Sequence, residues 1–494
     1  MAKKSNIPKV VLIETILNYP ETINPPIQFP EFKNFELHEK LDPENEIYRA
    51  IRNAFKLLDF DKKNINTEEW NPLSEMIKPG DTVLLKPNFV LHKSNRKETS
   101  KEELITHPSV IFAVLDYVIL ALRDKGLVIL GDAPIQEADF NEIINQLNLD
   151  NILKKYKSKT NVKIELLDFR KERSVNRKYR EIQRIPLSGD PRGYCTIDLG
   201  KNSAFSDISN QSSLFRVTNY DKKKMVNFHN NGHHKYLIAN SVLQADVVIS
   251  LPKLKTHRKA GLTCALKNLI GINGSKDCLP HHRKGSIEEG GDEYLHMSWR
   301  KRKYSDILEK RAQIKNSLFG FFLYVLKSFI ILTEKIFPYK DPFKEGSWYG
   351  NQTVPRTVVD INYIIKYASK KGNLTRLKPK RKFLSITDAV IVGEKEGPLC
   401  PSKKAIGYIL ISRDFIANDI VAALLARFSP KKIPSIVFSL NSQINSNNIT
   451  NKDDIELISN NPDFSDMDSF IRNNSIKLEP SECWKNHIEL TDYD

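Results

Sequence analysis

Short apolar runs bounded by turn residues recur along the chain, and longer stretches with apolar residues at helical spacing lie between them. Continuous apolar runs predict strands buried on both faces at 10–16, 82–85, 127–130 and 247–251. In contrast, residues 44–58 place apolar side chains three and four positions apart, which predicts a helix. The alternation of the two kinds of segment predicts an α/β fold.

Residues 82–130 give the clearest indication of parallel strands. A helix is predicted to open at Thr106-His107-Pro108, because proline suits the first helical turn. Lys125-Gly126 is predicted to close it as a basic last turn followed by a glycine. Strand, helix and strand in this order are typical of a βαβ unit.

The rest of the chain extends the same pattern and adds an insertion. Further strands are predicted at 192–199, 383–386, 388–392 and 407–411, and helices at 237–242, 261–270, 357–368 and 416–426. We therefore predict an α/β fold with a mostly parallel sheet flanked by helices. Residues 1–302 and 346–440 form one discontinuous α/β domain, 303–345 form a helical insertion, and 441–494 form a polar C-terminal segment.

The net charge of the chain indicates which classes of partner it favours, and its cysteines indicate which cofactors and which cellular compartment are expected. The chain has 494 residues and a formal net charge of +16, which favours anionic partners. Nucleic acid is the weakest of these, because the basic residues lack the interleaved aromatic platforms of known modules. The five cysteines form no C-x-x-C pair, which argues against a zinc ribbon or an iron–sulfur cluster. No secretory signal is recognisable, and a cytoplasmic protein is expected.

The stretch 318–332, with the sequence LFGFFLYVLKSFIIL, leaves three alternatives open. It is shorter than the roughly 20 residues that a spanning helix needs, and Lys327 interrupts it. A buried helix and a helix lying at a membrane interface are the two favoured interpretations, ahead of a true span. Membrane association through 318–332 is therefore one expectation.

Polar residues begin where three predicted parallel strands end. Lys86 and Asn88 follow the first strand, Asp132 follows the second, and Lys253-Leu254-Lys255-Thr256-His257 follows the third. In an open α/β sheet, ligands bind beyond the carboxyl ends of the strands. We therefore predict that the three junctions converge on one polar site, although any one of them alone could be an ordinary polar turn.

The residue types at these junctions suit an anionic substrate and proton transfer. The predicted catalytic residues are Asp132, Lys255 and His257, while a helix-capping role is the alternative for Asp132. Lysines offer point charges for phosphate or carboxylate, with solvated surface lysines as the alternative. The predicted substrate-binding residues are Lys86, Asn88, Lys253, Lys267, Asn268, His281 and His282.

Other nearby groups leave further chemistry open. Asp132, His257 and His281 are candidate ligands of a divalent metal, since imidazole and carboxylate suit transition metals. The Gly271–Ser275 segment lacks the P-loop pattern, so its glycines are interpreted as turn residues. Asp388, Glu394 and Glu396, around a predicted acidic turn at 393–398, could face the same pocket.

The motifs LLKPN, THP, GDAP, LPKLKTH, GLTCALKNLIG and ITDAVIVGEKEGP occur in this order between residues 80 and 425. As a set they resemble the uncharacterised family called domain of unknown function 362. Some members carry ferredoxin-like iron–sulfur modules, which implies redox work, but this chain lacks the cysteines and resembles a subgroup without that module.

Two hypotheses follow from the sequence. The first is an enzyme acting on a phosphorylated or carboxylated small molecule, by metal-assisted or redox chemistry. The alternative is a non-catalytic ligand-binding protein or a scaffold at the membrane surface.

Overall fold

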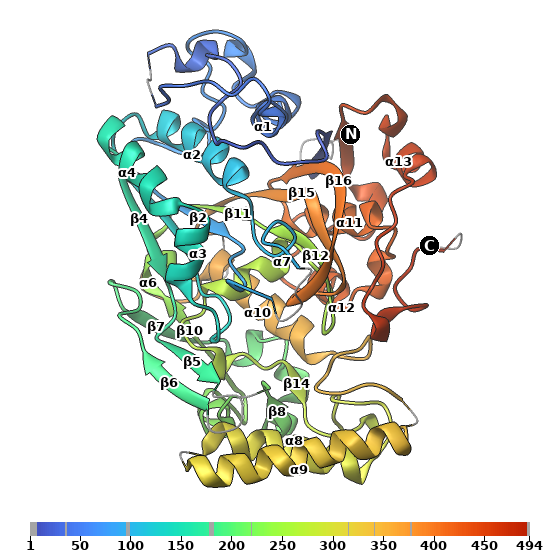
Figure 1. Ribbon diagram of the computed structural model, residues 1–494. Coiled ribbons are helices and arrows are strands. Elements are labelled where there is room, and N and C mark those ends of the chain that lie inside the picture. The colour runs from blue at the N-terminus through green and yellow to red at the C-terminus, as the bar shows by residue number, and fades with distance from the viewer. Residues whose placement is uncertain are drawn as a thin grey trace.

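One large sheet forms the centre of the molecule, with helices on both of its faces (Figure 1). The computed structural model describes residues 7–34, 37–94, 99–176, 182–218, 220–314, 316–339, 341–375 and 378–491. In spatial order the sheet contains β17 (Glu456–Ser459), β1 (Lys9–Glu14), β16 (Cys400–Ser412), β15 (Lys382–Glu396), β11 (Val247–Leu251), β2 (Thr82–Pro87), β3 (Leu127–Asp132) and β4 (Lys163–Asp168). Two short strands, β12 (Lys253–His257) and β13 (Gly261–Thr263), extend it beside β15.

The strand directions are mostly parallel. From β15 through β11, β2 and β3 to β4, each strand runs parallel to its neighbour. β16 is antiparallel to both β15 and β1, and β17 runs parallel to β1 at the edge. The predicted fold class, a mostly parallel sheet flanked by helices, is confirmed. Its carboxyl edge is where a ligand site is expected.

Burial on both faces explains why the strands are continuous apolar runs. In β1, Val10 and Leu12 belong to one hydrophobic core, while Val11 and Ile13 belong to the core on the opposite face. Successive side chains of a strand point to opposite faces, so both sets must be apolar when helices cover both sides.

Two helical layers cover these cores. The first layer contains α1 (Glu46–Leu57), α2 (Pro108–Leu122), α3 (Phe140–Gln146) and α4 (Leu149–Lys159). The second contains α6 (Asn240–Gln244), α7 (Ala265–Asn268), α10 (Thr353–Tyr367), α11 (Phe415–Leu425), α12 (Pro434–Leu440) and α13 (Met467–Asn473). α2 begins where predicted, with the His107 side chain accepting a hydrogen bond from Ser109 N. It ends at Leu122, before the predicted Gly126 stop, because Arg123 adopts a left-handed conformation.

Several smaller elements lie toward the lower end of the molecule in Figure 1. They are a sheet of β7 (Tyr194–Asp198), β10 (His233–Ala239) and β9 (His229–Asn230), a pair of β8 (Phe215–Arg216) and β14 (His282–Arg283), a hairpin of β5 (Glu172–Asn176) and β6 (Ile182–Pro186), and α5 (Lys222–Phe228). α8 (Trp299–Gln313) and α9 (Ser317–Ile336) lie side by side across that end (Figure 1). They account for the helices predicted within 303–345. The proposed division at residue 441 stays a prediction, and the segment beyond it contributes β17 and α13.

Three predicted elements are wrong in type or extent. Residues 261–270 form β13, α7 and a 3-10 turn, and residues 237–239 belong to the strand β10, with α6 following. Short apolar runs do not distinguish a helix from a buried strand. The acidic stretch at 393–398 is largely strand rather than turn, because β15 continues to Glu396 and forms a long hairpin with β16.

α9 is not a buried helix. Only Leu323 and Ile330 among its large apolar side chains are buried, whereas Leu318, Phe322 and Phe329 are more than half exposed. No helix in the described part of the chain combines the length and apolar character required to span a membrane. Of the three alternatives for 318–332, burial is therefore wrong, and a span has no support.

Candidate functional site

Side chains from the three strand ends meet in one buried network. Lys86 Nζ lies 2.7 Å from Asp132 Oδ1 and 3.4 Å from Asn268 Oδ1. Asn88 Nδ2 also donates to Asn268 Oδ1, at 3.3 Å, and Asn88 Oδ1 accepts from Lys255 Nζ at 2.6 Å. Five of the predicted site residues are thus connected, from β2, β3, β12 and α7.

A glycine allows this network to close. Gly271 follows α7, and a Cβ added to it would lie 2.0 Å from Asp132 Oδ1 and 2.7 Å from Lys86 Nζ. Gly271 lies in the 3-10 turn Leu269–Ile272, in agreement with its interpretation as a turn residue, but its φ is not in the left-handed region. Gly271 is required because its backbone lies directly against the ion pair, where no side chain fits.

A second buried ion pair lies on the neighbouring strand. Lys253 Nζ is 2.9 Å from Asp388 Oδ2, and both side chains are fully buried. Tyr19 donates to Asp388 Oδ1 at 2.6 Å and also contacts Lys253 Nζ. Asp388 further accepts the backbone N–H of His107 at 3.0 Å. Each partner of Asp388 comes from a different part of the chain, so this pair also ties the N-terminal connector to the sheet.

The carboxylates Glu394 and Glu396 do not join Asp388 at the site. Glu394 lies 3.6 Å from Lys404 and accepts the backbone N–H of Glu479 at 2.9 Å. Glu396 accepts the N–H of Glu482 at 2.8 Å. These two residues therefore hold the C-terminal segment against the β15–β16 hairpin.

A group of lysines near the network lacks matching carboxylates. Within the described residues, neither Lys255 nor Lys267 forms an ion pair, and burial together with neighbouring lysines lowers the pKa of both. The pKa of Lys267 falls to about 7, through burial and the charges of Lys276 and Lys259. Burial likewise lowers the pKa of Lys259 and of Lys276 to about 8. We call Lys255, Lys259, Lys267 and Lys276 the lysine cluster.

All three predicted histidines lie within the electrostatic reach of this cluster. Burial and the charge of Lys267 hold the pKa of His257 well below its usual range. His257 Nδ1 accepts the backbone N–H of Lys259 at 3.0 Å, which places the ring proton on Nε2. Burial and the charge of Lys259 lower the pKa of His281 to about 3, and its Nδ1 lies 2.6 Å from Leu279 O. Both rings are therefore neutral near pH 7, and His257 can donate a hydrogen bond to an anion.

His282 follows His281 and lies in β14, and among the described atoms no hydrogen bond joins its side chain to the other predicted residues. Its Nε2 is 3.9 Å from Glu293 Oε1, and its buried Nδ1 has no hydrogen-bond partner among the described atoms. Burial and the charge of Lys259 keep its pKa well below the usual range.

The side chains at the site do not fit a metal centre. Across the described ranges, no three His, Cys, Asp or Glu residues lie close enough together to hold a metal ion. Asp132 is instead occupied by Lys86 and by the N–H of Phe89, which donates to Asp132 Oδ2 at 2.7 Å. The metal role left open for Asp132, His257 and His281 is not supported among the described residues.

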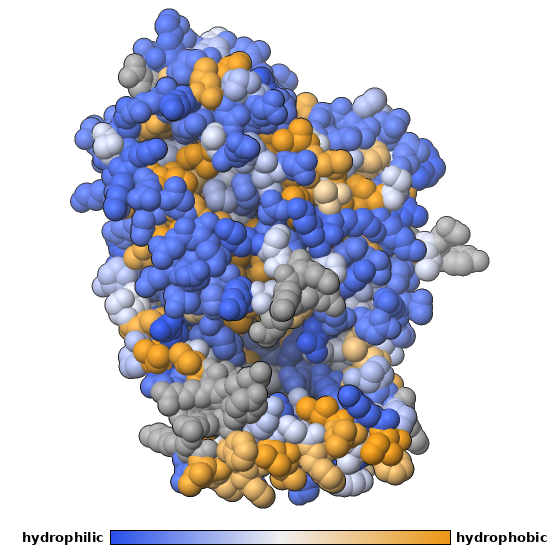
Figure 2. All heavy atoms as spheres, in the orientation of Figure 1, coloured by the Kyte–Doolittle hydropathy of each residue, from blue (hydrophilic) through white to orange (hydrophobic). Residues whose placement is uncertain are grey.

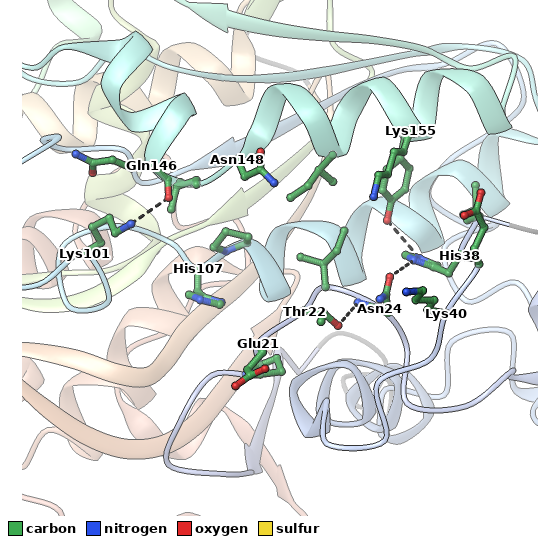
Figure 3. A pocket seen from close by; sticks show the side chains of 18 of the residues that line it. Glu21, Thr22, Asn24, His38, Lys40, Lys101, His107, Gln146, Asn148 and Lys155 are labelled. Atoms are coloured by element: carbon green, nitrogen blue, oxygen red, sulfur yellow. Dashed lines mark hydrogen bonds between the residues drawn. The ribbon is translucent and has the colours of Figure 1, made fainter.

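A cavity of about 630 Å³ lies next to His107, whose backbone N–H donates to Asp388 (Figure 3). Lys101 and His107 line it from the segment that leads into α2, and Lys155 lines it from α4. His107 also stacks on Tyr19, with ring centroids 3.8 Å apart. Tyr19 therefore connects the ring of His107, at the wall of the cavity, to Asp388 and Lys253.

Sequence reasoning missed several residues of this region. Tyr19 lies in a proline-rich connector with no chemical motif, and His107 was interpreted only as part of a helix start. Lys259 and Lys276 were not singled out either, although both flank predicted site residues in the sequence. Proximity to His257 and to Gly274–Ser275 is the one signal that could have drawn attention to them.

One protein-family model matches part of the chain. Residues 185–424 match a family model described as "Domain of unknown function (DUF362)", and no curated protein matches the chain. The motifs LPKLKTH, GLTCALKNLIG and ITDAVIVGEKEGP lie inside the matched range, whereas LLKPN, THP and GDAP precede it.

One similar solved structure is the lactate racemase apoprotein from Thermoanaerobacterium thermosaccharolyticum. The identity is 11% and the TM-score 0.29, over 75% of this chain and 55% of that chain, so the match spans about half of that protein. A likeness of this size carries no argument about function. The match to the family model, over residues 185–424, covers the segment that contributes β12, α7 and the lysine cluster.

Proposed function

We propose that this protein is an enzyme that binds a phosphorylated or carboxylated small molecule at the lysine cluster. The supporting observation is the excess of enclosed lysines over carboxylates around Lys255 and Lys267. An unpaired charge taken out of water costs several kcal/mol, of the order of 3–5 kcal/mol when its partner is missing. A bound anion would offset this cost, and Lys267 is only partly buried, so an anion can reach it from solvent.

The same cluster suits proton transfer. With a pKa of about 7, Lys267 would be present in both protonation states at neutral pH, as an acid–base group requires. His257 would donate from Nε2 to the anion, while Asp132 would hold Lys86 in place through their ion pair. In this proposal Lys255 and Lys267 contact the substrate, and the Lys86–Asp132 pair positions the strand ends that carry them.

Replacing Lys267 by methionine is expected to weaken anion binding by about tenfold or more. A hydrogen bond to a charged group contributes roughly 1.5–3 kcal/mol, and the apolar side chain of similar length keeps the packing. Isothermal titration calorimetry of the full chain with inorganic phosphate and with succinate measures the Kd of each. The anion with the lower Kd indicates whether the site favours a phosphorylated or a carboxylated substrate.

The matched control is Lys154→Met, which removes an exposed lysine of α4. It should bind both anions as the wild type does. Absence of binding by the wild type, or equal Kd values for the two variants, would refute the proposed site.

The stabilisation of the folded protein by a bound anion is also expected to depend on pH. The pKa of Lys267 is about 7 in the folded protein and roughly 10.4 in an unfolded chain. The folded state therefore binds fewer protons between these values, and the stability of the unliganded protein rises with pH across that window. Below pH 7 the lysine is charged, its burial cost is fully present, and a bound anion relieves it.

Sulfate is the appropriate probe, because its charge does not change over this range. The rise in Tm caused by sulfate should be larger below pH 7 than above pH 8, at constant ionic strength. Lys267→Met should show a smaller rise with a weaker pH dependence, and an unchanged profile in that variant would contradict the assignment to Lys267.

A further inference from the structure

α9 presents an unpartnered apolar face along its whole length. Leu318, Phe322, Val325, Phe329, Leu332 and Ile336 recur at spacings of three and four, and their exposed fractions range from 49% to 83%. The opposite side of the helix packs Leu323 and Ile330 against Ile307 of α8. The face is 20 residues, or about 30 Å, long. A continuous exposed apolar patch of this size marks a contact surface.

α8 attaches this face to the body of the molecule. Glu309 of α8 lies 2.6 Å from Arg216 and 2.9 Å from Lys284, and Lys301 forms a buried ion pair with Asp341. The N-terminal end of α8 is tied to the end of α9, since Arg300 donates to Phe337 O at 2.7 Å. These contacts fix α9 at the surface of the molecule. Figure 2 shows apolar side chains gathered over this end of the molecule.

Basic residues border the apolar face. A groove of about 690 Å³ runs between α8 and α9, with Lys303 and Lys310 of α8 on one side and Leu326, Phe329 and Ile330 of α9 on the other. Among the described residues, neither lysine has an ion-pair partner, and both are exposed. The acidic Asp306 between them is paired with Lys284 at 2.6 Å. The free charge along the groove is therefore positive.

We infer that α9 docks in the plane of an anionic lipid bilayer, with its apolar face among the acyl chains and Lys303 and Lys310 at the headgroups. An apolar helix face bordered by lysines is the pattern of interfacial membrane helices. A second copy of the chain fits less well, because a symmetric contact would bring the lysines of both copies into one interface in a protein of net charge +16. The membrane contact is independent of the proposed anion site, since it involves other residues.

Vesicle sedimentation of the full chain tests this docking. The protein should pellet with vesicles of equal parts phosphatidylcholine and phosphatidylserine, and much less with phosphatidylcholine alone. Lys303→Gln/Lys310→Gln should lower binding to the anionic vesicles by about tenfold or more, since each lysine near such a surface contributes on the order of a fivefold factor. Phe322→Gln/Phe329→Gln should lower it by more than about tenfold, because it removes the buried apolar area.

A control variant and a fluorescence measurement test whether vesicle binding is specific to α9. Leu17→Gln/Ile287→Gln changes two other exposed apolar residues, 56% and 51% exposed, and should bind as the wild type does. Trp299, at the start of α8, is 74% exposed, while Trp70, Trp348 and Trp484 are at most 1% exposed. Tryptophan emission should therefore shift to the blue with anionic vesicles, and the shift should vanish in Trp299→Phe.

The inference fails if the wild type pellets with neither kind of vesicle, or if the control pair loses binding equally. It also fails if sedimentation velocity shows a dimer that Phe322→Gln/Phe329→Gln converts to a monomer without any vesicle binding by the wild type. That outcome would identify a second copy as the occupant of the apolar face.

Discussion

Replacing Lys253 by methionine is expected to lower the free energy of unfolding by about 3–5 kcal/mol. The substitution leaves Asp388 as a fully buried carboxylate without its cation, although Tyr19 and the N–H of His107 still donate to it. Breaking one partner of a buried pair is costly because the remaining charge stays desolvated. Urea unfolding followed by circular dichroism measures the loss.

An exposed ion pair supplies the control. Lys403 contacts Glu102 with both side chains more than a third exposed, so Lys403→Met should change the free energy of unfolding by less than about 1 kcal/mol. Lys253→Met/Asp388→Asn should recover much of the loss, because no uncompensated charge then remains. Equal effects of Lys253→Met and Lys403→Met would show that the buried pair contributes no more than a surface pair.

Replacing Asp132 by asparagine is expected to destabilise the unliganded protein by about 3 kcal/mol or more. Asparagine keeps an oxygen for the N–H of Phe89 and fits against Gly271, but it removes the counter-ion of Lys86. Under the proposed function, the loss of a carboxylate also makes the lysine cluster more positive. Phosphate should therefore raise the Tm of Asp132→Asn by more than it raises the Tm of the wild type, as thermal unfolding with and without phosphate will measure.

Asp468→Asn is the matched control, because this carboxylate pairs with Lys452 at the surface with 69% exposure. It should alter neither stability nor the response to phosphate appreciably. A destabilised Asp132→Asn without the larger phosphate response would leave the ion pair as a structural element and argue against an anion site beside it.

Much of the site was predictable because its residues stand at the ends of recognisable strands. Lys86, Asp132 and Lys255 could be grouped from sequence, since parallel strands end at the same edge of a sheet. The partner of Lys253 was harder to assign. Asp388 was one of three acidic candidates around the predicted turn, and the turn itself was wrong because β15 continues to Glu396. Tyr19 was unpredictable, since it reaches Asp388 across 369 positions of sequence.

The role of Gly271 shows a similar limit. The sequence predicted the turn at this glycine, but it did not predict that the backbone of Gly271 lies against the Lys86–Asp132 pair. Such a close approach depends on how α7 sits relative to β2 and β3, and this packing has no local signature.

The local pattern of apolar and polar residues determined the fold class, the βαβ unit and the polar strand ends, because burial on one or both faces imposes a short-range period on the chain. Tertiary structure alone decided which charges are paired. Asp132 neutralises Lys86 and Asp388 neutralises Lys253, while Lys255 and Lys267 remain without a carboxylate among the described residues. Tertiary structure also decided that one face of α9 is exposed. The hydrophobicity of a helix indicates its preference for an apolar contact, but it does not indicate whether the same chain provides that contact.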